Sequence, residues 1–262
     1  MVLDALSPQR RRLVLGAAAL ILLLIIALLI TVAARALAPD PAPVPQDQPG
    51  PVLLVPGYGG RIESLDPLAA ALRASGRSVI VVQPVGGNTG DLRTEAKHLS
   101  EVAEQALDSG GPSVDVIGYS AGGVVARLWV RDEGGAAVAR RVLTLGSPQH
   151  GTSQAALGAE LAGGCPTACE QLVPDSDLLR RLNAGDETPD GPLWATVRST
   201  YDRVVTPVES AALNGAVNIV VQDSCPASTA AHGDLPGHPV TVAALSSVLG
   251  SDAPSPPTGV KC

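Results

Sequence analysis

The sequence predicts an α/β fold with a mostly parallel central sheet flanked by helices, plus an N-terminal transmembrane helix. Short apolar runs alternate with Ala/Leu-rich or amphipathic segments along residues 51–249, as strand–helix units do. Several of these runs are uninterrupted and rich in Val, Ile and Leu, as strands covered on both faces are. An uncharged run of 22 residues, from Leu13 to Ala34, precedes them.

The composition excludes several classes of protein. Of the 262 residues, 45% are hydrophobic and 16% are charged, which excludes a disordered chain. The 28 Gly and 23 Pro follow no three-residue period, which excludes a collagen-like chain. Aromatic residues make up 2% and the net charge is −7, so we predict no nucleic-acid partner. Because Phe is absent, the core must be built from Ala, Val, Leu and Ile.

The N-terminal run has the length of a membrane span. A helix over 13–34 would measure about 33 Å, enough to cross the hydrocarbon core of a bilayer. The basic cluster Arg10 to Arg12 predicts that residues 1–12 are cytoplasmic and that the rest of the chain lies outside. The alternative is a cleaved signal peptide, because Ala36-Leu37-Ala38 has the form of a cleavage site, although Pro39 follows it. The domain is therefore expected to be extracellular and membrane-anchored, or secreted if the segment is cleaved.

Residues 35–50 are predicted to form a stiff spacer between the membrane and the domain at 51–262. The stretch from Pro39 to Pro51 contains six prolines, counting both ends, and favours an extended chain. Residues 1–38 contain four Arg and one Asp, a net charge of +3, so the remainder carries −10. A domain this acidic has no electrostatic reason to bind a phosphate backbone.

The elements of the domain are expected in the following order along the chain. Strands are predicted at 51–55, 78–82, 114–117, 141–145, 194–199 and 217–221. Helices are predicted at 65–74, 91–107, 124–131 and 240–249, and the second of these is clearly amphipathic. Residues 151–191 show little periodicity. This segment is expected either to border a substrate cleft, as a lid or an acyl-chain wall, or to be a disulfide-stapled surface loop.

The four cysteines agree with export. An even number of cysteines in an oxidising compartment predicts two disulfides, with three possible pairings. Cys165 and Cys169 lie four residues apart, Cys225 lies in a late loop and Cys262 is the last residue. We favour Cys165–Cys169 and Cys225–Cys262, of which the second would hold the C-terminal tail. The alternative, a zinc site, lacks both a CxxC pair and a nearby histidine pair, so no metal is predicted.

The segment Gly118-Tyr119-Ser120-Ala121-Gly122 has the form GxSxG between a predicted strand and a predicted helix. A sharp strand-to-helix turn forces the serine into a strained conformation, and glycine on both sides leaves room for it. The serine oxygen then projects at the helix N-terminus, where backbone N–H groups can stabilise an oxyanion. The motif could arise by chance, but its position between strand and helix favours Ser120 as a nucleophile.

A nucleophilic serine needs a base, and in sheets with such an elbow an acid and then a histidine follow it along the chain. The histidines are His98, His150, His232 and His238. Only the last two follow the last predicted strand. We predict His232 as the base and His238, which precedes Pro239, at the start of the final helix. Asp202 directly follows the 194–199 strand and is the predicted acid, whereas its rival Asp223 is interpreted as a solvated loop residue.

The oxyanion of a tetrahedral intermediate needs two hydrogen-bond donors. One is the backbone N–H of Ala121, the residue after the nucleophile. The other is predicted to be the N–H of Tyr58, because Gly57-Tyr58-Gly59 follows the first core strand and permits close approach of the backbone. The alternative for this segment is an ordinary glycine turn.

Several motifs together resemble the secreted bacterial class 2 triacylglycerol lipases. They are Val-Pro-Gly-Tyr-Gly-Gly at 55–60, Gly-Tyr-Ser-Ala-Gly-Gly at 118–123, Leu-Gly-Ser-Pro-Gln-His-Gly-Thr at 145–152, Asp202 with Val205 and Pro207, and His232 with Leu235. The resemblance covers roughly residues 50–250 and implies an α/β-hydrolase with a Ser120–Asp202–His232 triad and no organic cofactor. It departs from the family at Pro56 and Gln149, where such enzymes often carry histidine, and in the N-terminal run.

The predicted function is that of a serine ester hydrolase acting on carboxylic esters of lipids or on small esters. It would work through an acyl-enzyme on Ser120, with no partner besides the substrate and the membrane, and as a monomer. An acyltransferase or a thioesterase with the same triad is the nearest alternative. A membrane-tethered binding domain without catalysis is the alternative from another class, because fold alone does not determine function.

Overall fold

The computed structural model describes residues 8–36, 44–108, 110–161 and 165–262, which fall into two separate units. The first unit, Met1–Asp40, contains helix α1 (Pro8–Ala36). Among the residues that the structure describes, no helix is both long enough and apolar enough to cross a membrane. The transmembrane helix predicted at 13–34 is therefore not confirmed. The predicted cytoplasmic segment 1–12 and the predicted spacer 35–50 lie partly outside the described residues.

The second unit, Pro41–Cys262, is built on a six-stranded sheet. The strands are β1 (Val52–Val55), β2 (Val79–Val81), β3 (Val114–Tyr119), β4 (Ala139–Leu145), β5 (Leu193–Arg198) and β6 (Val217–Val220). Their order across the sheet is β2-β1-β3-β4-β5-β6, and every neighbouring pair is parallel. Each strand predicted from the sequence is present, with ends displaced by at most two residues.

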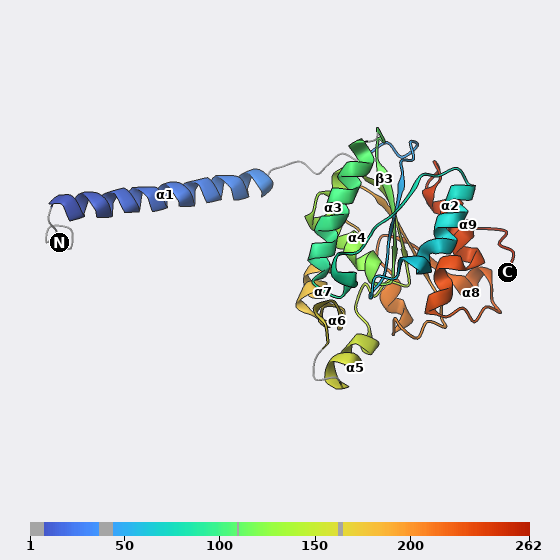
Figure 1. The fold of residues 1–262 in the computed structure, drawn as a ribbon. Coiled ribbons are helices and arrows are strands. Elements are labelled where there is room, and N and C mark those ends of the chain that lie inside the picture. The colour runs from blue at the N-terminus through green and yellow to red at the C-terminus, as the bar shows by residue number, and fades with distance from the viewer. Residues whose placement is uncertain (1–7, 37–43, 109, 162–164) are drawn as a thin grey trace. The chain divides into compact units, whose positions relative to one another are not determined.

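Helices cover both faces of this sheet (Figure 1). They are α2 (Asp66–Ala74), α3 (Leu92–Asp108), α4 (Ala121–Asp132), α5 (Ser153–Leu161), α6 (Thr167–Gln171), α7 (Asp177–Leu182), α8 (Val221–Ser224) and α9 (Pro239–Leu249). Helices α3, α4, α6 and α7 pack on one face, and α2 and α9 pack on the other. This arrangement follows from the strand order, because parallel neighbours must be joined by crossover connections that run over a face of the sheet.

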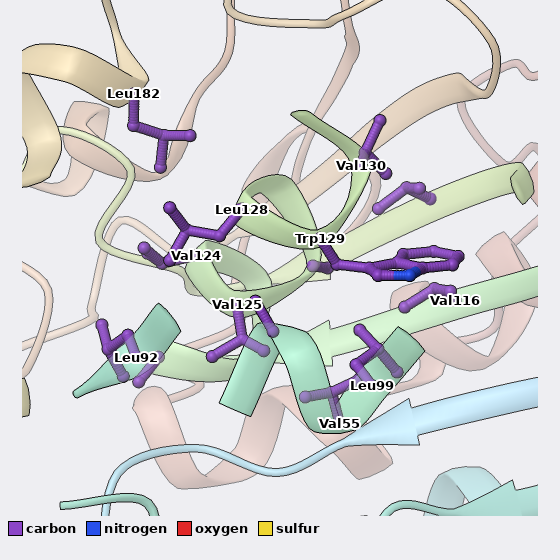
Figure 2. Close-up of a cluster of buried hydrophobic side chains, with 14 of the residues drawn as sticks. Val55, Leu92, Leu99, Val116, Val124, Val125, Leu128, Trp129, Val130 and Leu182 are labelled. Atoms are coloured by element: carbon purple, nitrogen blue, oxygen red, sulfur yellow. The ribbon is translucent and has the colours of Figure 1, made fainter. Parts of the chain in front are cut away.

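Alternation along the strands divides the core into two clusters. In β1, Leu53 and Val55 contact the α3–α4 side, whereas Val52 and Leu54 contact the α2–α9 side. All four side chains are buried, as expected for a central strand whose successive residues point to opposite faces. Figure 2 shows the first cluster, in which the fully buried Trp129 of α4 lies among aliphatic side chains.

Two segments differ from the sequence-based expectation. Helix α4 begins at Ala121 rather than at residue 124, so it follows Ser120 directly. The segment 151–191 contains the short helices α5, α6 and α7, and all three contribute buried side chains to the core. Helices of five and six residues, such as α6 and α7, are too short to show a recognisable hydrophobic period.

A cluster of buried charges at the amino ends of β3 and β4 forms hydrogen bonds to residues near both ends of the domain. Asp115 Oδ2 accepts hydrogen bonds from Arg140 at 2.6 Å and from Arg77 at 2.5 Å. Arg140 also donates to the carbonyls of Gln46 and Gly250, at 2.8 and 2.7 Å. Residue 46, which was expected in the spacer, is therefore attached to the domain. This cluster lies at the end of the sheet opposite to Ser120, because Asp115 is near the start of β3.

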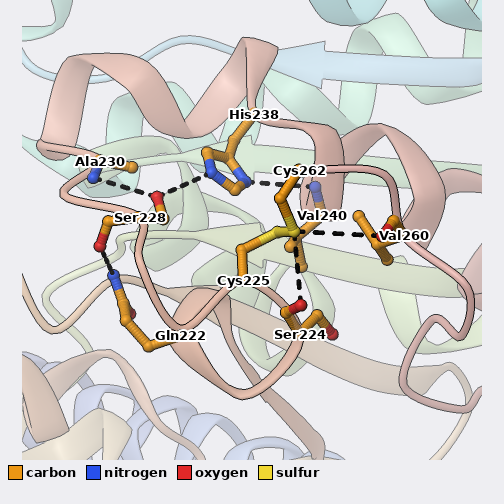
Figure 3. Close-up of a disulfide and its surroundings, with 9 residues drawn as sticks. All are labelled: Gln222, Ser224, Cys225, Ser228, Ala230, His238, Val240, Val260 and Cys262. Atoms are coloured by element: carbon orange, nitrogen blue, oxygen red, sulfur yellow. Dashed lines mark hydrogen bonds between the residues drawn. A yellow bond between two sulfur atoms is a disulfide. The ribbon is translucent and has the colours of Figure 1, made fainter.

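The structure contains the two disulfides favoured from the sequence, Cys165–Cys169 and Cys225–Cys262. The second joins residues 37 positions apart and attaches the C-terminal residue to the loop after α8 (Figure 3). That loop leads directly to His232. The C-terminal tail is thus covalently linked to the segment that carries the predicted base.

Candidate active site

The predicted nucleophile, acid and base all lie beyond the carboxyl ends of the strands. Ser120 follows β3, and its backbone N–H donates to the carbonyl of Leu145, the last residue of β4, at 2.8 Å. Asp202 follows β5, and His232 follows β6 through the loop after α8. The carboxyl ends of parallel strands share one edge of a sheet, so residues far apart in the sequence come together there.

Ser120 has the backbone conformation of a nucleophile elbow. Its φ is +54° and its ψ is −128°, a region that non-glycine residues rarely occupy. At two positions the turn packs so closely on other backbone that only glycine, which has no side chain, fits there. A Cβ on Gly118 would lie 2.5 Å from the Cα of Gly123, and a Cβ on Gly122 would lie 2.6 Å from the Pro56 carbonyl oxygen. The strained backbone conformation of Ser120 can therefore form only because glycine occupies these two positions.

Asp202 and His232 form a buried hydrogen-bonded pair. His232 Nδ1 lies 2.7 Å from Asp202 Oδ2, and the two residues are 8% and 5% exposed. Asp202 Oδ1 accepts hydrogen bonds from the backbone N–H groups of Val204 and Val205, at 2.8 and 3.0 Å. Because the carboxylate accepts, Nδ1 of the imidazole carries the proton and Nε2 has a free lone pair. The pair can therefore take up a proton on Nε2.

Two further residues enclose this pair. Gly146, with φ of +52°, directly follows β4, and a Cβ there would lie 3.1 Å from both Asp202 Oδ2 and His232 Nδ1. The Tyr119 ring lies 5.1 Å from the His232 ring, and its hydroxyl donates to the His232 carbonyl at 3.3 Å. Burial, reinforced by the charges of Asp202 and Asp234, raises the pKa of Tyr119 to about 12. Tyr119 is thus a neutral hydrogen-bond donor that links the elbow to the base.

The loop after β1 lies directly against the elbow. A Cβ on Gly57 would lie 2.8 Å from Ser120 Cβ and 3.4 Å from Ser120 Oγ. In the described part of the chain, the backbone N–H groups of Tyr58 and Ala121 donate no hydrogen bond. Ala121 is the first residue of α4, where backbone N–H groups have no partner within the helix. Two unused donors therefore lie beside Ser120.

Ser120 Oγ itself makes no hydrogen bond to a described residue. Of the two contacts that the predicted triad requires, the structure therefore contains the one between His232 and Asp202, but no hydrogen bond between Ser120 and His232 among the described residues. Catalytic hydrogen bonds of this kind often tighten only when substrate is bound.

The loops that carry the acid and the base are joined by hydrogen bonds. Ser199 Oγ donates to the Ala230 carbonyl at 2.6 Å and accepts from Gln222 Nε2 at 3.0 Å. Gln222 also donates to the carbonyl of Ser228, whose hydroxyl lies 3.0 Å from His238 Nε2 (Figure 3). These contacts hold the segment before His232 against the segment before Asp202.

The rival residues occupy other places. Asp223 is exposed on α8, and His98 pairs with Glu101 along α3 at 3.3 Å. His150 lies 2.7 Å from Glu187, and this contact and the N–H of Asn214 lower the pKa of that glutamate against the effect of burial. His238 is the N-cap of α9, because its Nδ1 accepts the N–H of Val240 at 3.1 Å. None of these four residues contacts Asp202 or His232 among the residues described.

Gln149, one of the two departures from the family pattern, is fully buried and bonded on both sides. Its Oε1 accepts from Arg127 at 3.2 Å, and its Nε2 donates to Thr144 at 3.3 Å. Burial lowers the pKa of Arg127 to about 10. Arg127 belongs to none of the motifs singled out in the sequence, yet it is fully buried on a helix whose other buried residues are apolar or glycine. Gln149 therefore holds the loop after β4 in place.

Asn88 is a second buried polar residue that belongs to none of the sequence motifs. It is 1% exposed and donates to the carbonyls of Pro56 and Gly57, at 2.9 and 3.0 Å. Its only sequence signal is its place in the glycine-rich stretch 86–90, which is typical of a turn. Among the described residues, no group of three or more His, Cys, Asp or Glu side chains could hold a metal ion.

Comparison with known proteins shows similarity of structure only. No protein-family model matches the chain, and no curated protein sequence matches it. Lipase B from Aspergillus fumigatus has a similar structure, with a TM-score of 0.70 and 20% identity over 87% of this chain. The match spans 59% of that longer lipase.

Lipase BlEst2 from Bacillus licheniformis is similar in both of its solved forms. Its mature form matches with a TM-score of 0.65 and 17% identity over 81% of this chain and 96% of its own. Its propeptide form matches with a TM-score of 0.65 and 18% identity over 85% of this chain and 54% of its own. Together with the parallel sheet and its flanking helices, these matches show that the chain has the α/β-hydrolase fold.

Proposed function

We propose that the chain is a serine ester hydrolase that cleaves carboxylic esters of lipids. The observation that supports this most strongly is the buried Asp202–His232 hydrogen bond of 2.7 Å at the edge of the sheet where Ser120 occupies a strained elbow. A histidine oriented by a carboxylate, a serine at a helix N-terminus and two unused backbone donors are the parts that acyl transfer requires.

In the proposed reaction, His232 Nε2 takes the proton of Ser120 Oγ while that oxygen forms a bond to the ester carbonyl carbon. The resulting oxyanion accepts hydrogen bonds from the N–H groups of Tyr58 and Ala121. The imidazolium, stabilised by Asp202, then gives its proton to the leaving alcohol as the C–O bond breaks. Water then attacks the acyl carbon while His232 Nε2 takes its proton, and His232 returns that proton to Ser120 Oγ as the acyl C–O bond breaks, which releases the acid and restores the free serine.

The surroundings of the site support a lipid-like substrate. Tyr58, Tyr201 and Val204 lie on the oxyanion loop and the acid loop, and they are 44%, 45% and 46% exposed. We propose that these exposed side chains contact the acyl chain and so remove it from water. Structural neighbours that are described as lipases support the same substrate class. The proposed relationship to class 2 triacylglycerol lipases rests on the sequence motifs.

Labelling with a fluorophosphonate probe tests the reaction class, because the probe forms a covalent bond with an activated serine. We expect the wild type to be labelled and Ser120→Ala to be unlabelled while folding normally. A folded wild type that takes up no label would favour the non-catalytic binding domain instead.

Rates on p-nitrophenyl esters of increasing acyl length then test the substrate class. We expect the specificity constant kcat/KM to rise with acyl length, because each added buried CH₂ contributes about 0.8 kcal/mol. Product transferred to an added alcohol in preference to water would assign an acyltransferase, and faster cleavage of matched thioesters would assign a thioesterase.

We also propose that the domain works outside the cytoplasm, either tethered through the N-terminal segment or released from it. The two disulfides support an oxidising compartment, and the basic cluster before the uncharged run supports this orientation. Protease added to intact cells should degrade the tethered domain, whereas a released domain should be found in the medium. A domain found only inside intact cells would contradict export.

A further inference from the structure

One buried side chain holds the loop that follows β1. Asn88 ends a short 3₁₀ turn, Val85–Asn88, and its φ is +55°. Both of its hydrogen bonds, from Nδ2 to the carbonyls of Pro56 and Gly57, reach residues more than 30 positions away. Its Oδ1 is buried without a partner among the described residues. The amide therefore serves as a pair of donors to one loop rather than as part of its own turn.

The second of these bonds determines the direction of a neighbouring N–H. The carbonyl of Gly57 and the N–H of Tyr58 belong to one planar trans peptide group, so they point in opposite directions. Fixing the oxygen at 3.0 Å from Asn88 Nδ2 therefore fixes where the Tyr58 N–H points. The same oxygen also accepts the N–H of Gly60 at 3.0 Å. Two donors on one carbonyl polarise the peptide group and strengthen its N–H as a donor.

The other side of this loop lies against the nucleophile. Gly57 is so close to Ser120 that a Cβ would lie 2.8 Å from Ser120 Cβ, and a Cβ on Gly122 would lie 2.6 Å from the Pro56 oxygen. The 57–58 peptide is thus held between the Asn88 amide and the elbow. Its N–H donates to no described residue and belongs to the loop that lies directly against Ser120.

The turn that carries Asn88 is itself anchored. Glu95 of α3, which is 6% exposed, accepts the N–H of Val85 at 3.0 Å. The carbonyl of Thr89 accepts the N–H of Ala168 of α6 at 3.1 Å. Gly60 packs on the turn so closely that a Cβ there would lie 3.1 Å from Gly87. Asn88 is therefore fixed relative to α3 and α6 and can hold the oxyanion loop at a constant position.

We propose that Asn88 is a positioning residue that directs the Tyr58 N–H at the oxyanion. The proposal rests on the proposed ester hydrolysis, because it assigns Asn88 a part in stabilising that intermediate. Asn88 acts through the 57–58 peptide and does not touch the substrate. Without it, the donor remains in the chain but loses its direction.

Two substitutions at Asn88 and one control beside it test this role. Asn88→Gly removes both donors while retaining a residue that accepts positive φ. Asn88→Asp keeps the shape but opposes the two carbonyls with carboxylate oxygens. Thr89→Ala is the control, because among the described residues the Thr89 hydroxyl bonds only to Gly86 within the same turn, at 3.3 Å.

The kinetic result separates positioning from general damage. We expect Asn88→Gly to lower kcat on a p-nitrophenyl ester by about 10- to 100-fold, and Asn88→Asp by at least as much, with KM within about twofold. The Ki of a trifluoromethyl ketone, which mimics the oxyanion, should rise by the same factor by which kcat/KM falls. Thr89→Ala should stay within about twofold of the wild type in both measurements. Wild-type kcat in folded Asn88→Gly, or a ketone Ki that does not follow kcat/KM, would overturn the proposal.

A measurement without turnover makes the test independent of the reaction. The chain has three tyrosines, so ¹⁵N-tyrosine labelling of the full chain yields one backbone amide signal each for Tyr58, Tyr119 and Tyr201. We expect the Tyr58 signal to move in both Asn88 variants and to stay in place in Thr89→Ala. If only one of the two Asn88 variants folds, that variant is sufficient for the test. A Tyr58 signal that does not move in a folded variant contradicts the role of Asn88. A wild type that hydrolyses no ester would contradict the proposed function. The coupling between Asn88 and Tyr58 would still be decided by the Tyr58 signal.

Discussion

Asp202 orients His232 and holds its own loop, and one substitution separates these two roles. Its Oδ2 accepts the Nδ1–H of the imidazole, while its Oδ1 accepts the N–H groups of Val204 and Val205. An asparagine in its place can keep Oδ1 as an acceptor and so preserve the loop. Its amide N–H₂ would then face His232 Nδ1, which must become the acceptor, and Nε2 would carry the proton instead.

We therefore expect Asp202→Asn to fold normally and to lower kcat on esters by about 10⁴-fold, because a protonated Nε2 cannot accept the proton of Ser120. The matched control is Asp223→Asn, since Asp223 is exposed on α8 and was the rival acid. This control should keep wild-type kcat. If the two variants exchanged their phenotypes, the acid would have been wrongly assigned.

At the scale of single residues, the sequence predicts the residues proposed to carry out the chemistry better than it predicts the residues that hold them in place. Ser120, Asp202 and His232 are recognisable because glycine spacing and position after strands are local signals. Asn88 is not recognisable in this way, because its importance lies in what it touches. Asn88 bonds to Pro56, 32 positions away, and no pattern around either residue specifies that distance.

The second disulfide controls an element, the loop between α8 and His232. Cys225 and Cys262 are 37 positions apart, whereas Cys165 and Cys169 are four apart. In the chain-entropy description, a longer closed loop restricts the unfolded state more. The Cys225–Cys262 bridge should therefore stabilise the fold more than the other.

Replacing Cys225 and Cys262 by serine should lower the free energy of unfolding by about 4 kcal/mol, against about 2 kcal/mol for the Cys165 and Cys169 pair. Urea unfolding of both double variants, with the wild type as reference, measures the difference. Equal losses in the two variants would show that loop closure does not govern these bridges.

The start of α9 depends on the protonation of His238. Its Nδ1 accepts the N–H of Val240, so the helix cap requires neutral imidazole. Burial lowers the pKa of His238 below its ordinary value of 6.5, against the opposing effect of Asp234. A lowered histidine pKa means that the folded state prefers the neutral form. This stability is present above pH 6.5 and is lost as the pH falls through the lower pKa of the folded state.

His238→Asn keeps a capping acceptor but cannot be protonated in this range. Between about pH 7.5 and about pH 5, we expect the wild type to lose about 1 kcal/mol more unfolding free energy than this variant. Urea unfolding at both pH values measures the loss. A variant that follows the wild type at both values would place the acid sensitivity elsewhere.

At the scale of the whole molecule, Asp115 joins segments from both ends of the domain. Its side chain and that of Arg140 are fully buried, and Arg140 carries the pairing onward to the carbonyls of Gln46 and Gly250. Removing one charge from a buried pair leaves the other without compensation. The cluster lies at the end of the sheet away from Ser120, so it concerns stability rather than chemistry.

Asp115→Asn is expected to lower the free energy of unfolding by about 3–5 kcal/mol. The activity per folded molecule should stay at the wild-type value. The exposed Asp223→Asn, which the activity test also uses, should change stability by no more than about 0.5 kcal/mol. A small loss in Asp115→Asn would mean that asparagine satisfies both arginines.

The general fold was predictable because it depends on local patterns. Uninterrupted apolar strands and the helices between them require a parallel sheet covered on both faces, and all six strands occur within two residues of their predicted ends. Helices α5, α6 and α7 were not predicted as helices. The last two are short, and α5 is rich in alanine without a clear apolar stripe.

By itself, the sequence determined the α/β class, the elbow at Ser120 and the placement of Asp202 and His232 after strands, because these depend on spacing between near neighbours in the chain. Only the tertiary structure decided which side chains meet. The 2.7 Å contact of His232 with Asp202 joins residues 30 positions apart, and Asn88 reaches the oxyanion loop over 32. Such contacts depend on how the strands line up in the sheet, since the sheet brings its carboxyl ends to one edge whatever their separation along the chain.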